Sequence, residues 1–397
     1  MQKNSSPEEN LSTSRLTQLS LISFIILGAL CSLSLIDDFL LNGNNWKQGD
    51  WLINNHQTII RRGILGSTII FISDFLKTSP LIITVIIQEA LLITLFSCTY
   101  LAFKALLKQN ISYIILIFSS SFFVIFWAFD VQGGMRKELI SYAALSLLVI
   151  IPLFPSKKLI IALISSFLFI ISTVGHEINV LLTPAFIAIF IVTYNPNLKS
   201  NLVRFASIIF LLLVSASLLY SVYYSKIDNL SFICEPLIQR GLMPNICDGA
   251  IAALDRDLNY SLTRFVANKL NYINIFLFSV SYLIAIFPMI YLISLHKNKR
   301  IYYILFALFM VPIIPLYPLA IDWGRWMSMH IVSFGLFFIA IIITGKNHIV
   351  KIQKNCTIYI FVAIAILFAP GHVSGFAPSS ILREILKTVF NIHEQPF

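Results

Sequence analysis

The chain has 397 residues, of which 58% are hydrophobic and 12% are charged, and its mean hydropathy is +0.85. A soluble domain carries about twice that charged fraction, so the composition excludes a soluble globular enzyme. The formal net charge of +10 would indicate nucleic-acid binding in a soluble protein. In a membrane protein the cytoplasmic loops collect Lys and Arg, so we expect no nucleic-acid partner. The sequence predicts an all-α polytopic membrane protein.

Eleven apolar segments are long enough, or nearly so, to cross a bilayer core of about 30 Å. In chain order the predicted spans are 16–36, 81–103, 111–131, 139–154, 159–174, 178–195, 203–224, 271–295, 301–320, 328–344 and 356–370. Residues 1–15 form a polar tail before them. The first span is too long for a signal peptide and has no small-residue cleavage site, so we expect it to be retained. Residues 16–370 then form a single transmembrane domain, followed by the tail 371–397.

Basic residues set the predicted orientation. With the N-terminus in the cytoplasm, the cytoplasmic loops hold twelve Lys and Arg residues, whereas the short outer loops hold three, Arg136, Lys137 and Arg325. This orientation requires that residues 64–76, an apolar run of about thirteen, do not span. We predict that this run is an interfacial helix within a first outer loop, 37–80. The C-terminal tail is then also outside.

The longest polar segment, 225–270, is predicted to be a folded cap outside the membrane. It has charges of both signs and two prolines, Pro236 and Pro244. It also contains Cys234 and Cys247, and a disulfide between them would need an oxidising compartment. Two cysteines in one loop can equally be a coincidence, so the sequence leaves this bridge open.

Four polar groups lie where predicted spans meet the outer boundary of the membrane. The first three groups are Arg61–Arg62, Arg136–Lys137–Glu138 and His176–Glu177. The fourth group consists of Asp322, Trp323, Arg325 and Trp326. Basic residues on the outer face oppose the positive-inside bias, so their presence there indicates a site.

Each group also has a structural explanation. The pair at 61–62 can extend toward anionic lipid headgroups, and Trp323 and Trp326 can be ordinary interface residues. Arg325 can form a helix-end ion pair with Asp322. The pair at 176–177 can hydrogen-bond to neighbouring helix ends, and 136–138 can be helix-end charge.

Taken together, the four groups favour chemistry on a lipid-linked phosphate. A guanidinium group binds phosphate oxygens through two parallel hydrogen bonds. A nearby carboxylate or imidazole can take the proton of an attacking hydroxyl, and aromatic rings can stack on sugars. Charge that develops on a leaving diphosphate would be stabilised by the cations. These are the requirements of glycosyl transfer from a polyprenyl-diphosphate sugar.

The layout resembles the membrane-embedded glycosyltransferases of GT-C type and the O-antigen or capsular polysaccharide polymerases and ligases. The resemblance lies in the many spans and in a first outer loop that carries Asp37–Asp38, Asp50–Trp51 and Arg61–Arg62–Gly63. Likeness to the GT-C enzymes implies that Asp50 or Asp38 is the catalytic base or is linked to a metal. Likeness to the polymerases and ligases implies that outer arginines act without a metal, which matches Arg136, Arg325 and Arg240.

We therefore expect an integral membrane glycosyltransferase or polysaccharide polymerase in the cytoplasmic (inner) membrane of a bacterium. Its partners would be a polyprenyl-phosphate-linked glycan donor, a glycan or lipid acceptor, and membrane lipids. The candidate catalytic residues are Asp50, Asp38, His176 and Glu177. The candidate phosphate- and substrate-binding residues are Arg61, Arg62, Arg136, Lys137, Asp322, Arg325, Trp323 and Trp326. We expect no cofactor; a divalent metal is compatible with the acids, but no Cys/His spacing indicates one.

Two alternatives remain. A transporter or flippase of lipid-linked glycans would carry charges in the middle of its spans, which are nearly free of charge here. A membrane acyltransferase would use His176 as its base, but a cytosolic thioester donor would require that histidine on the cytoplasmic side.

Overall fold

The computed structural model describes residues 7–109, 134–195, 200–225, 227, 229–256, 262–263, 266, 272–296, 298–319 and 322–345. Over these residues the fold is all-helical, without a β-strand. The predicted spans 111–131 and 356–370 and the predicted tail 371–397 lie outside the described residues.

The helices follow one another with short connections. The α-helices are α1 (Pro7–Leu40), α2 (Lys47–Trp51), α3 (Gly63–Leu76), α4 (Pro80–Gln109), α8 (Glu138–Ile150), α9 (Lys158–Gly175), α10 (Thr183–Tyr194), α11 (Asn201–Tyr223), α12 (Ser231–Ile238), α14 (Tyr272–Ser294), α15 (Lys299–Met310), α16 (Leu316–Leu319) and α17 (Trp323–Ile343). The 3₁₀ segments are η3 (Ile151–Leu153), η4 (Pro155–Lys157), η5 (Glu177–Leu182), η6 (Pro244–Cys247) and η7 (Ala252–Asp255).

Among the described residues, six helices are long and apolar enough to cross a membrane. They are Pro80–Leu107, Pro155–Gly175, Glu177–Tyr194, Val203–Tyr223, Ile275–Ser294 and Trp323–Ile343. Each coincides with a predicted span, and the predicted first span lies within α1. The chain is thus a helical membrane protein, as the composition indicated.

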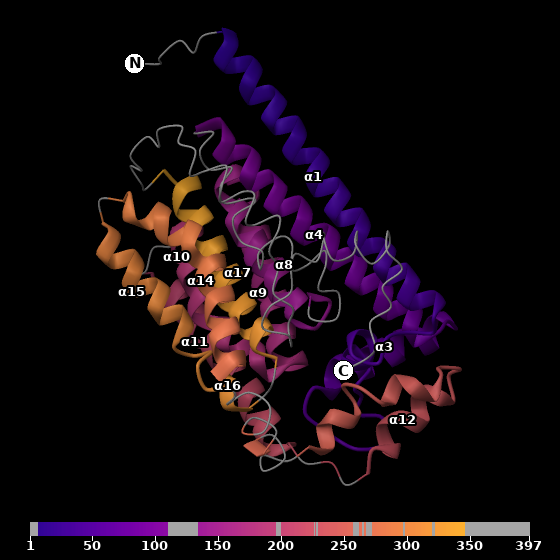
Figure 1. Cartoon of the computed structure of the whole chain (residues 1–397). Coiled ribbons are helices and arrows are strands. Elements are labelled where there is room, and N and C mark those ends of the chain that lie inside the picture. The colour runs from indigo at the N-terminus through magenta and orange to yellow at the C-terminus, as the bar shows by residue number, and fades with distance from the viewer. Residues whose placement is uncertain are drawn as a thin grey trace.

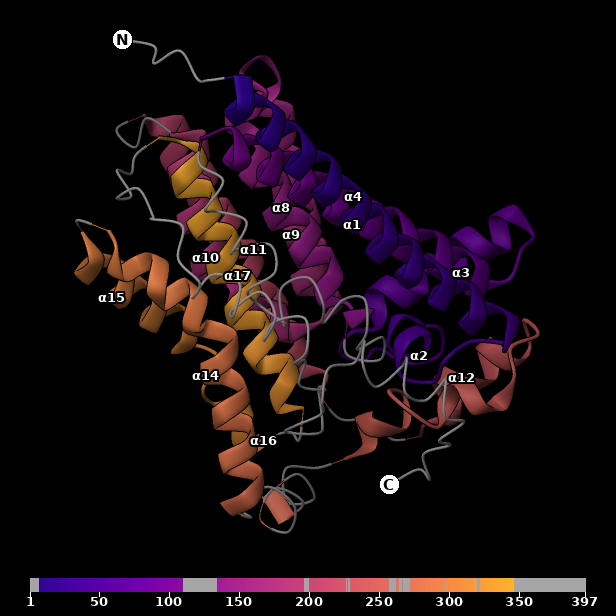
Figure 2. The same cartoon turned by 45° about the horizontal axis from the view of Figure 1, so that its top comes forward.

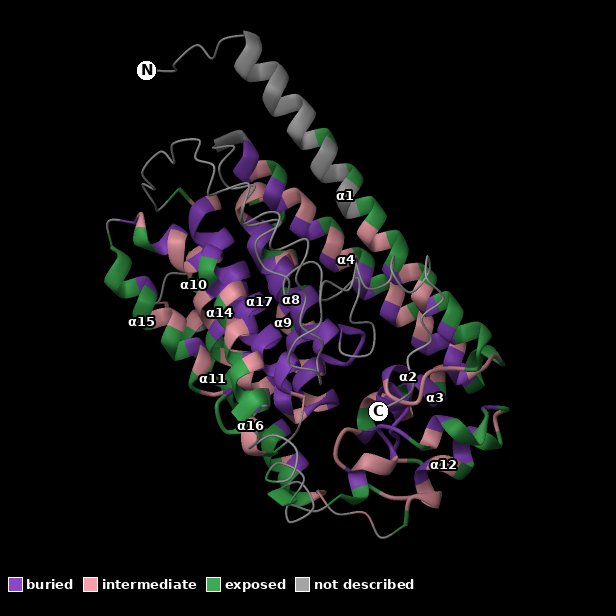
Figure 3. Cartoon of the chain, viewed as in Figure 1, coloured by how far each residue is buried: buried purple, intermediate pink, exposed green. Residues whose placement is uncertain are grey.

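The bundle is built around α17 and α8, which are buried along most of their length, whereas α1 and α15 lie at its edges (Figures 1 and 3). α4 packs against both α1 and α8, and α17 packs against α8, α10 and α14. Exposed Ile, Leu and Phe side chains cover the outer faces of α11 and α14, as lipid-facing helices require.

Two other predicted spans within the described residues are not among the six long apolar helices. The segment 139–154 is helical over Glu138–Leu153, but this helix is shorter than the six. Residues 301–320 were expected to form a continuous helix, but α15 ends at Met310 and turns connect it to the short α16. Three prolines in the segment, Pro312, Pro315 and Pro318, explain the interruption. Each lacks a backbone N–H and disrupts a continuing α-helix.

Segments from distant parts of the sequence gather at one end of the bundle, which we call the cap end. There the C-terminal end of α1 lies beside α2, α3 and α12 (Figure 2). Hydrogen bonds to main-chain carbonyls connect the cap to the first loop. The side-chain amide of Asn54 donates to the carbonyl of Ile233 at 3.0 Å, and the N–H of Ala250 donates to the carbonyl of Asn45 at 3.0 Å. Arg240 also forms an ion pair with Asp74 of α3, in which two hydrogen bonds join the guanidinium to the carboxylate.

The bridge that the sequence left open is formed: Cys234 of α12 and Cys247 of η6 are joined by a disulfide. It closes a loop of the cap with a sequence separation of 13 residues. Such a closure restricts the unfolded chain and stabilises the cap.

The predicted interfacial run is the helix α3, and its first turn is held close to the loop before it. Arg62, the residue before the helix, has a left-handed backbone (φ 66°). A Cβ on Gly66 would lie 2.0 Å from the carbonyl oxygen of Ile53, so only a residue without a side chain fits there. The close approach therefore fixes the start of α3, and with it the position of Arg62.

We expect Gly66→Ala to lower the stability of the protein by about 2 kcal/mol or more, because the added methyl group forces backbone to move. The melting temperature of the detergent-solubilised protein should fall by several degrees. Gly28→Ala in α1 is the matched control, since the nearest atom to its Cβ would be 3.9 Å away. Equal melting temperatures for the two variants would contradict the packing described for α3.

Candidate functional site

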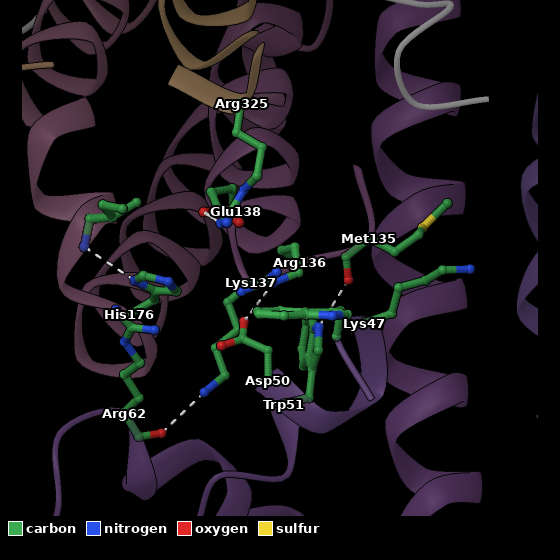
Figure 4. Close-up of polar contacts among 12 residues, drawn as sticks. Lys47, Asp50, Trp51, Arg62, Met135, Arg136, Lys137, Glu138, His176 and Arg325 are labelled. Carbon is green, nitrogen blue, oxygen red and sulfur yellow. Dashed lines mark hydrogen bonds and ion pairs between the residues drawn. The ribbon is translucent and has the colours of Figure 1, made fainter. Parts of the chain in front are cut away.

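The four polar groups predicted from the sequence meet at the cap end of the bundle (Figure 4). Arg62 pairs with Glu177, Arg325 pairs with Glu138, and the ammonium of Lys137 donates to the carbonyl of Arg62 at 3.1 Å. Together with Asp50, Arg61, Arg136, His176 and Asp322 we call this set the polar cluster. It joins segments that are more than 250 residues apart in the sequence.

Helix starts explain why acids are found here. Glu138 is the first residue of α8, Glu177 is the first residue of η5, and Asp322 precedes α17. The N-terminal end of a helix carries partial positive charge and unpaired N–H groups, and a carboxylate there is favourable. Because several helices begin at one place, their acids come together and provide partners for the arginines.

Arg62 and Glu177 form a partly exposed pair of the cluster. Nε of Arg62 lies 3.1 and 2.9 Å from the two carboxylate oxygens, and Nη2 lies 2.5 Å from one of them. Arg61 lies farther off, at 3.8 Å from the same carboxylate. About a fifth of the Glu177 side chain is exposed, so this pair lies at the edge of the cluster.

Arg325 holds two carboxylates at once. Its Nη2 donates to Glu138, and its Nη1 lies 2.7 Å from the carboxylate of Asp322. The helix-end pair that the sequence left open is therefore present, and it is joined to α8 as well. The guanidinium also lies over the ring of Trp326, 5.1 Å from its centroid. These contacts fix the beginning of α17 against α8.

Asp50 is the buried acid at the centre of the cluster. Its side chain is 0% exposed, and Nε of Arg136 lies 3.5 Å from one carboxylate oxygen. Neither oxygen accepts a hydrogen bond from the described residues. Burial acts to raise the pKa of Asp50, but the positive charges of Arg136, Lys137, Arg62 and Arg325 outweigh it and hold the pKa below its usual value. Asp50 is therefore an anion at neutral pH.

Lys137 is fully buried next to these arginines. Burial lowers its pKa to about 8, although Asp50 and Glu177 act in the opposite direction. A lysine with this pKa is present in both protonation states near neutral pH. It can donate a hydrogen bond or accept a proton within the cluster.

His176 is buried at the junction of α9 and η5. Its Nδ1 accepts a hydrogen bond from the N–H of Ile178 at 3.3 Å and lies 3.7 Å from the carboxylate of Glu177. Burial, followed by the positive charges of Arg62 and Arg325, lowers the pKa of His176 well below its usual value. The imidazole is thus neutral, and with Nδ1 accepting, its proton is on Nε2.

Asp38 lies apart from the other candidate acids. It forms an ion pair with Lys47 at 2.5 Å, and the side-chain amide of Gln48 is 3.5 Å from the same oxygen. That amide also donates to Gln88 at 3.0 Å, and Gln88 in turn donates to the carbonyl of Met135. A hydrogen-bonded chain therefore connects Asp38 to the loop that carries Arg136, but Asp38 does not contact the cluster itself.

The two candidate tryptophans are both buried. Trp323 donates its indole N–H to the carbonyl of Tyr317 at 2.8 Å, and Trp326 lies under Arg325. Trp46, which the sequence analysis did not select, is half-buried between two cations. The guanidinium of Arg136 lies 5.5 Å from its ring centroid, and that of Arg256 from the cap lies 5.8 Å away. Trp46 thus connects the cap to the cluster.

The pairing of Glu138 with Arg325, and the roles of Gln48 and Gln88, were not predicted from the sequence. A signal for Gln88 was present, because it and Glu89 interrupt an otherwise apolar span. Such polar residues within a span need partners inside the protein. Glu89 has one in Ser32 of α1, whose hydroxyl donates to it at 2.5 Å. Which residue partners Gln88 depends on the fold and could not be deduced from spacing.

The cluster carries one more basic side chain than acidic side chains. It holds five basic side chains and four carboxylates, and three of those carboxylates are hydrogen-bonded to an arginine. Within the part of the chain that the structure describes, no group of three or more His, Cys, Asp or Glu side chains is placed to hold a metal ion.

The stability of the protein should rise with pH above 8 because of Lys137. Its pKa is about 8 in the folded protein and about 10.4 when unfolded, so between these values the unfolded chain binds more protons. Deprotonation therefore favours the folded state. Lys137→Met should remove this part of the pH dependence, measured as melting temperature in detergent from pH 7.5 to 10. Identical slopes for the variant and the wild type would show that Lys137 does not titrate in this range.

Comparison of the chain with protein-family models, with curated proteins and with solved structures finds no match. The function is therefore inferred from the chemistry of the polar cluster and its position in a membrane protein.

Proposed function

We propose that the protein is a membrane-embedded glycosyltransferase or polysaccharide polymerase that acts at the outer face of the bacterial cytoplasmic membrane. It would transfer a sugar from a polyprenyl-(di)phosphate-linked donor to a glycan or lipid acceptor. The observation that carries this proposal is the buried polar cluster at the cap end. There Arg136 and Lys137 face Asp50, whose carboxylate makes no hydrogen bond to the described residues.

The position of the cluster suits a lipid-linked substrate. Six apolar helices are long enough to cross a membrane, and the cluster lies where several of them begin or end. A polyprenyl chain in the bilayer would place its diphosphate at the level of such helix ends. Guanidinium groups bind phosphate oxygens in pairs, and in a site largely closed to water each contact is stronger than on an exposed surface.

The chemistry needs one base and several cations. The acceptor hydroxyl gives up its proton while its oxygen forms a bond to the anomeric carbon of the donor. The bond from that carbon to the phosphate oxygen breaks, and the electron pair leaves with the diphosphate. Arg136, Lys137, Arg62 and Arg325 would stabilise the charge that develops there.

Asp50 is the acid best suited to be the base, because its oxygens are not taken up by hydrogen bonds to the described residues. Asp38 and Glu177 are each held in an ion pair with a basic side chain. His176 is neutral and next to Glu177, so it is the second candidate for accepting the proton.

The cap supports the proposed orientation. A disulfide persists in an oxidising compartment and is rare in the cytosol. The Cys234–Cys247 bridge is therefore compatible with a cap on the outer face, in agreement with the distribution of basic residues.

Asp50→Asn should lower the rate of glycan transfer by about 100-fold or more, because removal of a general base has an effect of this size. The product would be measured in membranes supplied with a polyprenyl-diphosphate-linked donor. Asp248→Asn, at an exposed position in the cap, should retain wild-type activity. A fully active Asp50→Asn variant that is present at normal abundance would show that Asp50 is not the base.

Reporter fusions test the orientation. A fusion after Asp248 in the cap should report the non-cytoplasmic side, and a fusion after Asn195, at the end of α10, should report the cytoplasm. The opposite pattern would place the polar cluster at the cytoplasmic face, and transfer from a lipid-linked donor on the outer face would then be ruled out.

A further inference from the structure

Asp50 differs from the other acids of the polar cluster in how its charge is balanced. Glu177 is hydrogen-bonded to Arg62, and both Glu138 and Asp322 are hydrogen-bonded to Arg325. Asp50 is completely buried and faces Arg136 at 3.5 Å, and its oxygens accept no hydrogen bond from the residues that the structure describes. A buried carboxylate normally satisfies its oxygens with donors. Asp50 is thus held in the cluster mainly by the positive charge around it.

Two cations of the cluster are also incompletely matched. Arg62 and Arg325 donate the hydrogen bonds that the other three acids of the cluster accept. Arg136 has no hydrogen-bond acceptor at its Nε among the described residues, and Lys137 donates to a main-chain carbonyl rather than to a carboxylate. Both are buried, and burying a positive charge without a full counter-ion is unfavourable. Among the acids, Asp50 has the largest electrostatic effect on both, with smaller effects of Glu138 and Asp322 on Arg136 and of Glu177 on Lys137.

We propose that Asp50 is the resident counter-ion of an anion site formed by Arg136, Lys137, Arg62 and Arg325, and that the diphosphate group of the donor takes over this role when it binds. The inference rests on the proposed function, because that function supplies the diphosphate. It adds that Asp50 weakens binding of the donor in the free protein.

Exchange of the counter-ion would also control when Asp50 acts as a base. In the free protein the surrounding cations hold the pKa of Asp50 low, so it accepts a proton poorly. A bound diphosphate neutralises those cations and adds negative charge nearby, and both effects raise the pKa of a carboxylate. Asp50 would then accept the proton of the acceptor hydroxyl most readily when the donor is in place.

Binding of inorganic diphosphate to the detergent-solubilised full-length protein tests this inference. It would be measured by calorimetry in the presence of a chelator. Asp50→Asn should bind diphosphate at least tenfold more tightly than the wild type, because the competing negative charge is gone. Arg136→Gln should bind it at least tenfold more weakly. Asp248→Asn is the control: this acid is exposed in the cap, and the affinity of the variant should stay within about twofold of the wild type.

The outcomes separate this inference from the proposed function. If Asp50→Asn binds diphosphate no more tightly than the wild type, while Arg136→Gln weakens binding, Asp50 is not the counter-ion but the donor site remains. If neither the wild type nor Asp50→Asn binds diphosphate, the anion site is refuted. Asp50→Ser gives a second neutral variant should Asp50→Asn fail to fold, and tighter binding is expected for it too. Tighter binding without loss of glycan transfer would support the counter-ion and refute Asp50 as the base.

Discussion

The structure of the cap end depends on the neutralisation of buried charge. Basic side chains from the first loop, from the start of α8 and from the start of α17 would be strongly unfavourable in a bundle of apolar helices if they stood alone. They are tolerated because Glu177, Glu138, Asp322 and Asp50 lie within a few ångströms of them. All of these pairs except Arg325–Asp322, which lies within the start of α17, join a helix end to another segment. The pairs therefore also fix where the helices meet.

The surrounding loops are shaped to support this arrangement. Arg62 has a left-handed backbone, and its carbonyl accepts the hydrogen bond of Lys137. Such a backbone is costly for a residue with a side chain and persists where the neighbouring structure enforces it. Here the close approach of Gly66 to Ile53 and the pair with Glu177 do so. Strain in one residue is thus compensated by packing and charge around it.

A buried network of ions is a poor means of stabilising a protein. Replacing such a network with apolar residues of similar volume is often neutral or stabilising, because the charges lose their hydration. Beyond its first turn α17 is buried mostly through apolar side chains, so ion pairs are not the main source of packing there. The retention of nine charged side chains at one end therefore favours a role in binding or catalysis. Binding of an anionic substrate at the membrane boundary, as we propose, fits their chemistry.

The sequence by itself determined the class of the protein and most of its apolar helices, because a bilayer imposes a minimum length and an apolar composition that are visible residue by residue. It also located the four polar groups, since charges next to long apolar runs are conspicuous. It did not indicate which charges pair: Arg325 with Glu138, or Arg62 with Glu177, are partners more than 100 residues apart. Nor did it separate Asp50 from Asp38, which have the same side chain in the same predicted outer loop, although the structure places Asp38 in α1 and Asp50 in α2. Only the tertiary structure decided this, because the pairing of a buried charge depends on which helix ends lie together, and that is set by packing across the whole bundle.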